Sequence, residues 1–282
     1  MAQDQNDPAL MIGAYRALAG TLYFLGDFET SRQYAMRGVQ IWRSGGVQSP
    51  VEEVNAPAVS CLVFQATSEW HLGEIGSCKA TIVEAILIAK GLNDMHGLAV
   101  ALIFAGLAAH LEHDPSGVER LASDAIELSM RQNFAAWLAM GTVLRGWARS
   151  VTGDPMGGIP WIERGIEGLR VTGSTREVPH CLGLKAEALH LANRTSEALA
   201  AIEEAEKIVE RSEEREWCAE LQRLRGVFLT KMGAARSEIE KAFSKAISTA
   251  KQQKSISLER RAEETYAEYR RKNASGSGGS EF

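Results

Sequence analysis

Apolar residues in this chain recur every three or four positions rather than every second one. The segment from residue 182 to residue 202 shows the pattern, with apolar side chains at Leu182, Leu184, Leu189, Leu191, Leu199 and Ile202. This spacing places apolar side chains along one face of an α-helix. No segment shows the sustained alternation that is typical of a half-buried strand. The pattern therefore predicts an all-α chain.

Short turn signals divide these helices at a nearly constant interval. They occur at Gly26-Asp27, Gly73-Glu74, His113-Asp114, Gly153-Asp154, Asn193-Arg194 and Gly233-Ala234. The steps between successive signals are 47, 40, 40, 40 and 40 residues. Gly and Asn at such points favour the left-handed backbone that ends a helix. The chain is therefore expected to be built from repeats.

Two sets of small residues keep the same register. Seven positions before each turn lie Ala19, Ala66, Gly106, Gly146, Ala186 and Gly226, and twelve positions after the first five turns lie Gly38, Ala85, Ala125, Gly165 and Ala205. Antiparallel helices approach closely where neither carries a bulky side chain. We expect about six antiparallel helix pairs, wound into a right-handed superhelical solenoid and closed by a polar C-terminal capping helix over residues 256–272.

The ends of the repeat domain can be placed from local signals. Asp7 and Pro8 are typical of an N-cap and a first helical position. We expect residues 1–6 to be disordered and residues 7–273 to form the repeat domain. Residues 274–282, Ala-Ser-Gly-Ser-Gly-Gly-Ser-Glu-Phe, resemble a cloning linker. We therefore expect the chain to be a piece of a larger protein.

The small-residue register and the turn chemistry resemble the tetratricopeptide repeat (TPR). The closest matches are Gly26-Asp27-Phe28-Glu29 and the segment from Asn193 to Ala198. The period of 40 residues departs from the usual 34 and is nearer that of HEAT repeats. The turn chemistry favours the TPR-like interpretation.

A narrower resemblance covers residues 7–268. It is carried by the segments 16–26 (RALAGTLYFLG), 137–147 (WLAMGTVLRGW) and 216–226 (EWCAELQRLRG). They are similar to the TPR-like C-terminal tail of bacterial class III adenylate or guanylate cyclase–ATPase signalling proteins. The resemblance implies a regulatory sensor or docking arm and implies no catalytic residue in this chain.

Charge and composition exclude several classes of function. The net charge of −5 and the pI near 5.8 argue against a nucleic-acid partner, which requires a concentrated basic face. No apolar stretch has the length of a membrane span, so no membrane partner is expected. The scattered cysteines Cys61, Cys78, Cys181 and Cys218 are typical of reduced cytoplasmic thiols.

No catalytic or metal-binding motif is present. The chain has no phosphate-binding loop, no H-E-x-x-H and no G-x-S-x-G. The one histidine cluster, His110 and His113 beside Asp114, falls short of a metal-ligand set and is better explained as a polar helix end. We expect no enzyme activity, no metal and no cofactor.

The first helix of each pair is expected to line a concave groove. Counting back three, six and ten residues from each turn gives the candidate partner-binding residues Arg16, Tyr23, Trp70, His110, Trp147, Glu187, His190 and Arg223. Aromatic and Arg side chains are typical anchors of interfaces, and aromatics at helical spacing are also typical of a core. The groove is expected to hold a protein or peptide, or upstream domains of the parent chain.

The leading functional hypothesis is a non-catalytic protein-interaction and regulatory module. The alternatives are a homo-oligomerisation module and a small-molecule-sensing repeat of a transcription regulator. The Gly- and Pro-containing loop of residues 44–57, which accounts for the longer first step, is either a functional insertion or tolerated slack.

Overall fold

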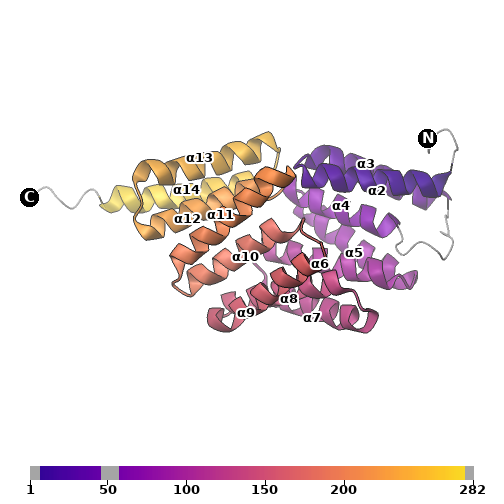
Figure 1. Ribbon diagram of the computed structural model, residues 1–282. Helices are drawn as coiled ribbons and strands as arrows, with labels where there is room; N and C mark the ends of the chain where they lie inside the picture. Colours follow the sequence, from indigo (N-terminus) through magenta and orange to yellow (C-terminus); the bar gives the residue numbers. More distant parts are fainter. Residues whose placement is uncertain (1–6, 46–56, 277–282) are drawn as a thin grey trace, which may run out of the picture.

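The computed structural model describes residues 7–45 and 57–276, and in these ranges it contains thirteen helices and no strand (Figure 1). The helices that begin each pair are α2 (Pro8–Phe24), α4 (Pro57–His71), α6 (Met95–Leu111), α8 (Ala135–Val151), α10 (Val178–Leu191) and α12 (Cys218–Met232). Their partners are α3 (Phe28–Gly45), α5 (Ile75–Gly91), α7 (Pro115–Gln132), α9 (Pro155–Val171), α11 (Thr195–Ser212) and α13 (Arg236–Gln252), and α14 (Ile256–Gly276) follows. The predicted six pairs with a capping helix are confirmed.

Caps and turns are formed by the residues that mark them in the sequence. The side chain of Asp7 accepts hydrogen bonds from the first backbone N–H groups of α2, and Pro8 begins that helix. Gly26 and Gly233 have φ angles of +82° and +68°, and Asn193 has +61°. These are the left-handed conformations that Gly and Asn adopt with little strain. Each one ends a first helix and reverses the chain.

The small residues allow the helices of a pair to touch. A Cβ atom added to Gly165 of α9 would lie 2.6 Å from the backbone oxygen of Ala139 in α8. One added to Gly226 of α12 would lie 2.7 Å from the ring of Phe243 in α13. A larger residue would push these helices apart, which explains the register seen in the sequence.

The solenoid completes a turn, so that its C-terminal helices lie beside its N-terminal ones (Figure 1). Carbonyl groups at the C-terminal ends of α2, α4 and α6 lack partners within their own helices, although that of Trp70 also accepts from the backbone N–H of Gly73 in the following turn. Each accepts a hydrogen bond from the C-terminal part of the chain: Phe24 from the backbone N–H of Arg215, Trp70 from the hydroxyl of Ser257, and Leu111 from the guanidinium of Arg261. The inner face is therefore enclosed.

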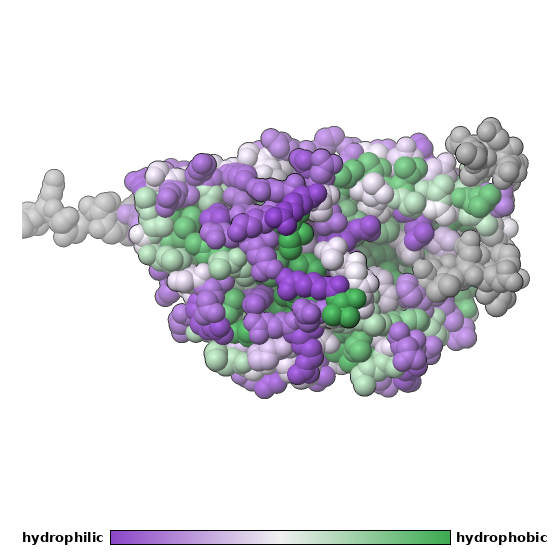
Figure 2. Space-filling model, in the orientation of Figure 1, coloured by the Kyte–Doolittle hydropathy of each residue, from purple (hydrophilic) through white to green (hydrophobic). Residues whose placement is uncertain are grey.

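The surface is polar over most of the face in Figure 2, and apolar residues show between the polar ones in several small patches, some of them near its centre. Among residues 7–45 and 57–276 no helix is long and apolar enough to cross a membrane. Residues 1–6, most of the 44–57 loop (46–56) and residues 277–282 of the expected linker lie outside the described residues. Residues 274–276 continue α14.

Candidate functional site

The inner face of the solenoid carries a cluster of aromatic and charged side chains. It contains five of the eight residues singled out in the sequence and three others; we call the set the inner cluster, and its members are Trp70, His110, Trp147, His180, Glu187, Glu220, Arg223 and Arg261. They come from α4, α6, α8, α10, α12 and α14. The cluster therefore draws on six of the seven helices that line the inside.

Trp147 and Glu187 form the first half of the inner cluster. The indole Nε1 of Trp147 donates to a carboxylate oxygen of Glu187 over 2.6 Å. The ring of His110 stands edge-on to the indole, with 4.5 Å between centroids, and its Nε2 lies 3.7 Å from Glu187. Trp147 is only 2% exposed, so this half of the cluster is shielded from solvent.

Glu220 holds two arginines in the second half of the inner cluster. Arg223 donates to it through two nitrogens, at 2.7 and 2.9 Å, and Arg261 lies 3.3 Å away. Burial acts to raise the pKa of Glu220, but the two guanidinium groups outweigh it and hold the pKa well below its usual range. Arg261 also lies 5.7 Å from the ring centroid of Trp70. The carboxylate is thus ionised and fully enclosed.

Histidine ring nitrogens that make no hydrogen bond within the described residues border the remaining space. His180 stacks on Trp217, with 3.8 Å between centroids, and its Nε2 makes no hydrogen bond within the described residues. Both ring nitrogens of His110 are in the same situation. The cavity between these rings, Glu187 and Glu220 measures about 10 Å³, which is room for about one water molecule. This cavity has no room for a peptide.

The other three predicted residues lie outside the cluster. Tyr23 is buried among Phe24, Phe28 and Phe64 at the N-terminal end. His190 is partly buried beside Phe228, and Arg16 is exposed on α2. The contact of all eight residues with a partner stays a prediction, but Trp70, His110 and Trp147 are enclosed rather than exposed along an open groove.

Sequence reasoning missed His180, Glu220 and Arg261. His180 and Glu220 each lie thirteen residues before a turn, which is one helical step beyond the three, six and ten positions that define the stripe. Extending the count would have found both. Arg261 has no such signal, because it enters the cluster through the packing of α14 against the early repeats.

His71 lies where the C-terminal helices meet the early repeats. Its ring stacks on Phe28 at 3.6 Å, and its Nδ1 lies 2.9 Å from the hydroxyl of Ser255. Burial lowers the pKa of His71 from 6.5 to about 3, and the charge of Arg261 acts in the same direction. The native state therefore holds this imidazole neutral in the pH range where the unfolded chain binds a proton.

We expect the free energy of unfolding to fall as the pH falls below about 6.5. In that range the imidazole of His71 binds a proton in the unfolded state but stays neutral in the native state. The contribution of His71 to the slope is up to about 1.4 kcal/mol per pH unit. His71→Phe should flatten the pH dependence of the free energy of unfolding, measured by urea denaturation between pH 7 and 4.5. Ser255→Ala removes the hydrogen bond but not the titrating group, so it should lower the curve without flattening it. Parallel curves for wild type and His71→Phe would contradict this assignment.

Metal chemistry finds no support among residues 7–45 and 57–276, where no group of three or more His, Cys, Asp or Glu side chains is close enough to hold an ion. The cluster instead offers hydrogen-bond donors, carboxylates and aromatic faces. Such groups recognise a polar or charged ligand and do not by themselves form a nucleophile–base pair.

Sequence comparison with known proteins finds no family and a distant relative among the curated proteins. No protein-family model matches the chain. An uncharacterised protein of Rhizobium meliloti (strain 1021) is 21% identical over 270 residues, which are 95% of this chain and 26% of that protein. The chain thus spans about a quarter of its relative's length.

Three solved structures resemble the chain at low sequence identity. A Rap protein in complex with competence and sporulation factor has a TM-score of 0.60 and 14% identity over 86% of this chain and 65% of its own. Aspartyl phosphate phosphatase F from Bacillus subtilis has a TM-score of 0.61 and 13% identity, over 90% and 62%. PlcR from Bacillus thuringiensis, in complex with the peptide PapR7 and DNA, has 0.53 and 14%, over 91% and 99%. The fold is that of a TPR-like helical solenoid.

Proposed function

We propose that this chain is a non-catalytic interaction and regulatory module that recognises a protein or peptide through its inner cluster. We further propose that it is the sensor or docking arm of a bacterial signalling ATPase or nucleotide cyclase. The resemblance of its repeat segments to such tails supports this parent, as does a relative about four times its length. Two of the similar folds were solved with peptides or signalling factors bound.

The observation that carries the proposal is the burial of ionised side chains on the inner face. Close packing of helix pairs requires only apolar residues there, and enclosing charges costs desolvation free energy. The inner face nevertheless buries Glu220 with its two arginines, and it places Glu187 beside Trp147. Local departures of this kind are typical of functional sites.

Several of the contacts that enclose the inner cluster are polar. Besides the three carbonyl hydrogen bonds, they include the ion pair of Lys254 with Glu29 of α3. We call these the closing contacts. Each of the three carbonyl hydrogen bonds contributes about 0.5–1.5 kcal/mol, and the exposed ion pair adds little because solvent screens it. Adjacent pairs keep their apolar core when these contacts break, so the solenoid opens without unfolding. A partner that binds only the open state shifts the population toward it.

The test is capture of proteins from the lysate of the source bacterium by immobilised chain. The baits are wild type, an opened variant (Lys254→Ala with Ser257→Ala), and the opened variant carrying Glu187→Gln. We expect the opened variant to retain more of a partner than wild type does, and Glu187→Gln to abolish the gain. Lys251→Ala, which removes an exposed lysine of α13, serves as the matched control and should bind like wild type. Circular dichroism confirms that each bait is folded. Equal capture by wild type and the opened variant would contradict recognition by the inner cluster.

A further inference from the structure

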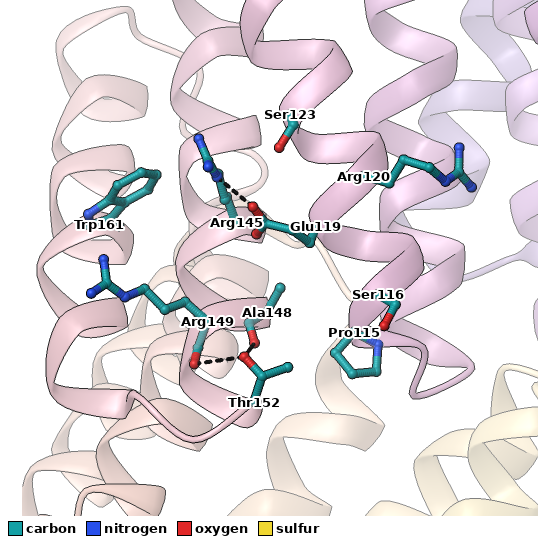
Figure 3. Close-up of a pocket in the computed structure, with 10 residues that line it drawn as sticks. All are labelled: Pro115, Ser116, Glu119, Arg120, Ser123, Arg145, Ala148, Arg149, Thr152 and Trp161. Atoms are coloured by element: carbon teal, nitrogen blue, oxygen red, sulfur yellow. Dashed lines mark hydrogen bonds and ion pairs between the residues drawn. The ribbon is translucent and has the colours of Figure 1, made fainter.

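A second recess lies on the outside of the solenoid, between α7 and α9, with α8 as its floor (Figure 3). Its volume is about 540 Å³, within the range of ligand-binding clefts. Three arginines and one glutamate line it, in a chain whose net charge is −5. With Asp154, which pairs with Arg149, this outer cleft has three positive and two negative side chains, a small positive excess on an acidic protein.

Arg145 is held in a fixed orientation at the floor of the outer cleft. Its Nε donates to Glu119 over 2.8 Å, and its guanidinium lies 4.9 Å from the ring centroid of Trp161 (Figure 3). Both contacts leave the terminal nitrogens of the guanidinium as donors. A planar cation held in this way loses little conformational entropy when it binds a carboxylate.

Arg149 lies one helical turn further along α8. Its guanidinium reaches over Gly157 of α9, where an added Cβ would lie 2.6 Å from the Nη2 atom. It pairs with Asp154, whose side chain is about half exposed. The glycine thus provides the room that this second cation occupies. Arg120 belongs to the lining as well, but in Figure 3 its guanidinium points away from Arg145 and Arg149.

Comparison with the next repeat shows which side chains of the outer cleft recur in the repeat and which occur only in this cleft. Lys185, forty residues after Arg145, pairs with Glu163 at 2.8 Å, so a basic residue on the floor of the outer groove is part of the repeat. The positions equivalent to Arg149 and Trp161 are Leu189 and Ala201, both buried and apolar. Arg149 and Trp161 therefore belong only to the groove between α7 and α9, and the groove between α9 and α11 has no equivalent cation or aromatic side chain.

The four-residue separation of Arg145 and Arg149 along α8 suggests the kind of ligand. Residues four apart on a helix are separated by about 6 Å along its axis. Alternate residues of an extended peptide are separated by about 6.7 Å and project to the same side. We propose that the outer cleft binds an extended acidic segment of a partner protein. Two carboxylate side chains of the segment, two residues apart, engage Arg145 and Arg149. A residue that flanks this pair of carboxylates lies against Trp161. This site is separate from the inner cluster and does not depend on its function.

The test is fluorescence anisotropy at low ionic strength with short labelled peptides on the full chain. One peptide carries two glutamates separated by a leucine, a second carries the glutamates next to each other, and a third replaces both with lysine. We expect the first to bind most tightly, and Arg145→Gln with Arg149→Gln to weaken it at least about tenfold, since each charge-assisted hydrogen bond is strong. Lys185→Gln, the equivalent residue of the next groove, should change its affinity less than about twofold.

Three results would overturn the proposal. They are equal affinity for the first and second peptides, equal weakening by Lys185→Gln, and displacement of the first peptide by inorganic phosphate at the same concentration of negative charge. The last result would identify a site for small anions instead of a peptide site. Thermal unfolding of each variant confirms that the loss of binding is not a loss of folding, because both arginines are at least partly exposed and do not belong to the core.

Discussion

Trp147→Ala is expected to lower the free energy of unfolding by about 3–5 kcal/mol, the usual range for removing a buried aromatic side chain. Trp147 is among the largest fully buried side chains, and helices α8 and α9 pack too tightly around glycines to collapse into the space. The substitution also removes the donor that Trp147 offers to Glu187 over 2.6 Å. A buried carboxylate that loses its hydrogen bond destabilises the native state further.

Urea denaturation followed by circular dichroism measures this change. Trp161→Ala is the matched control, because Trp161 is only partly buried on the outer surface and its loss leaves no enclosed cavity. We expect Trp161→Ala to cost less than half as much. Trp147→Phe should recover part of the lost packing but not the hydrogen bond, so its stability should fall between those of wild type and Trp147→Ala. Equal stability of Trp147→Ala and wild type would show that the inner cluster is not packed as described.

Arg223→Met is expected to destabilise the chain by about 3 kcal/mol at pH 7, because it leaves Glu220 with a single cationic partner in an enclosed site. The side chain of Glu220 is 5% exposed and that of Arg223 is 11% exposed. Neutralising the carboxylate should relieve the penalty, so Glu220→Gln in the Arg223→Met background should restore part of the stability. A double-mutant cycle gives the coupling between the two residues.

The pH dependence of this variant has a definite sign. In wild type the depressed pKa of Glu220 contributes stability that is present above the unfolded pKa of about 4.5 and is lost as the pH falls. In Arg223→Met this contribution is reduced, so the difference from wild type should shrink as the pH is lowered below about 4.5. Arg225→Met is the control, because Arg225 pairs with Glu206 on the outer surface, and it should cost less than about 1 kcal/mol. A difference that does not change with pH would contradict the electrostatic origin.

These two residues also show what the sequence could say about the inner stripe and what it could not. Counting from the turns put Trp147, Glu187 and Arg223 on the inner side of first helices, and they do share that face. The count assumes an open groove, because it treats each repeat only in relation to its neighbours. Whether the groove is open depends on the accumulated rotation over all repeats, which no single period encodes. Here the rotation brings α14 back to α4, and the stripe becomes interior.

The sequence by itself determined the helical class, the number of pairs and their junctions. Small residues at a fixed register and Gly or Asn at the turns are local requirements of close helix packing and of a left-handed backbone, so they can be read without the fold. Asp7 as the first cap and the lone departure from the 40-residue step belong to the same category.

Only the tertiary structure decided what the inner and outer faces are. His71 and Ser255 are 184 positions apart, and Arg261 reaches the carbonyl of Leu111 across 150. Contacts over such separations follow from how the pairs stack in three dimensions, and they leave no periodic trace in either partner. The outer cleft likewise depends on the gap between α7 and α9, because Arg145 and Trp161 belong to different helices and come into contact only when α8 and α9 pack. Local chemistry specified the repeats, and the sum of their small rotations set the site.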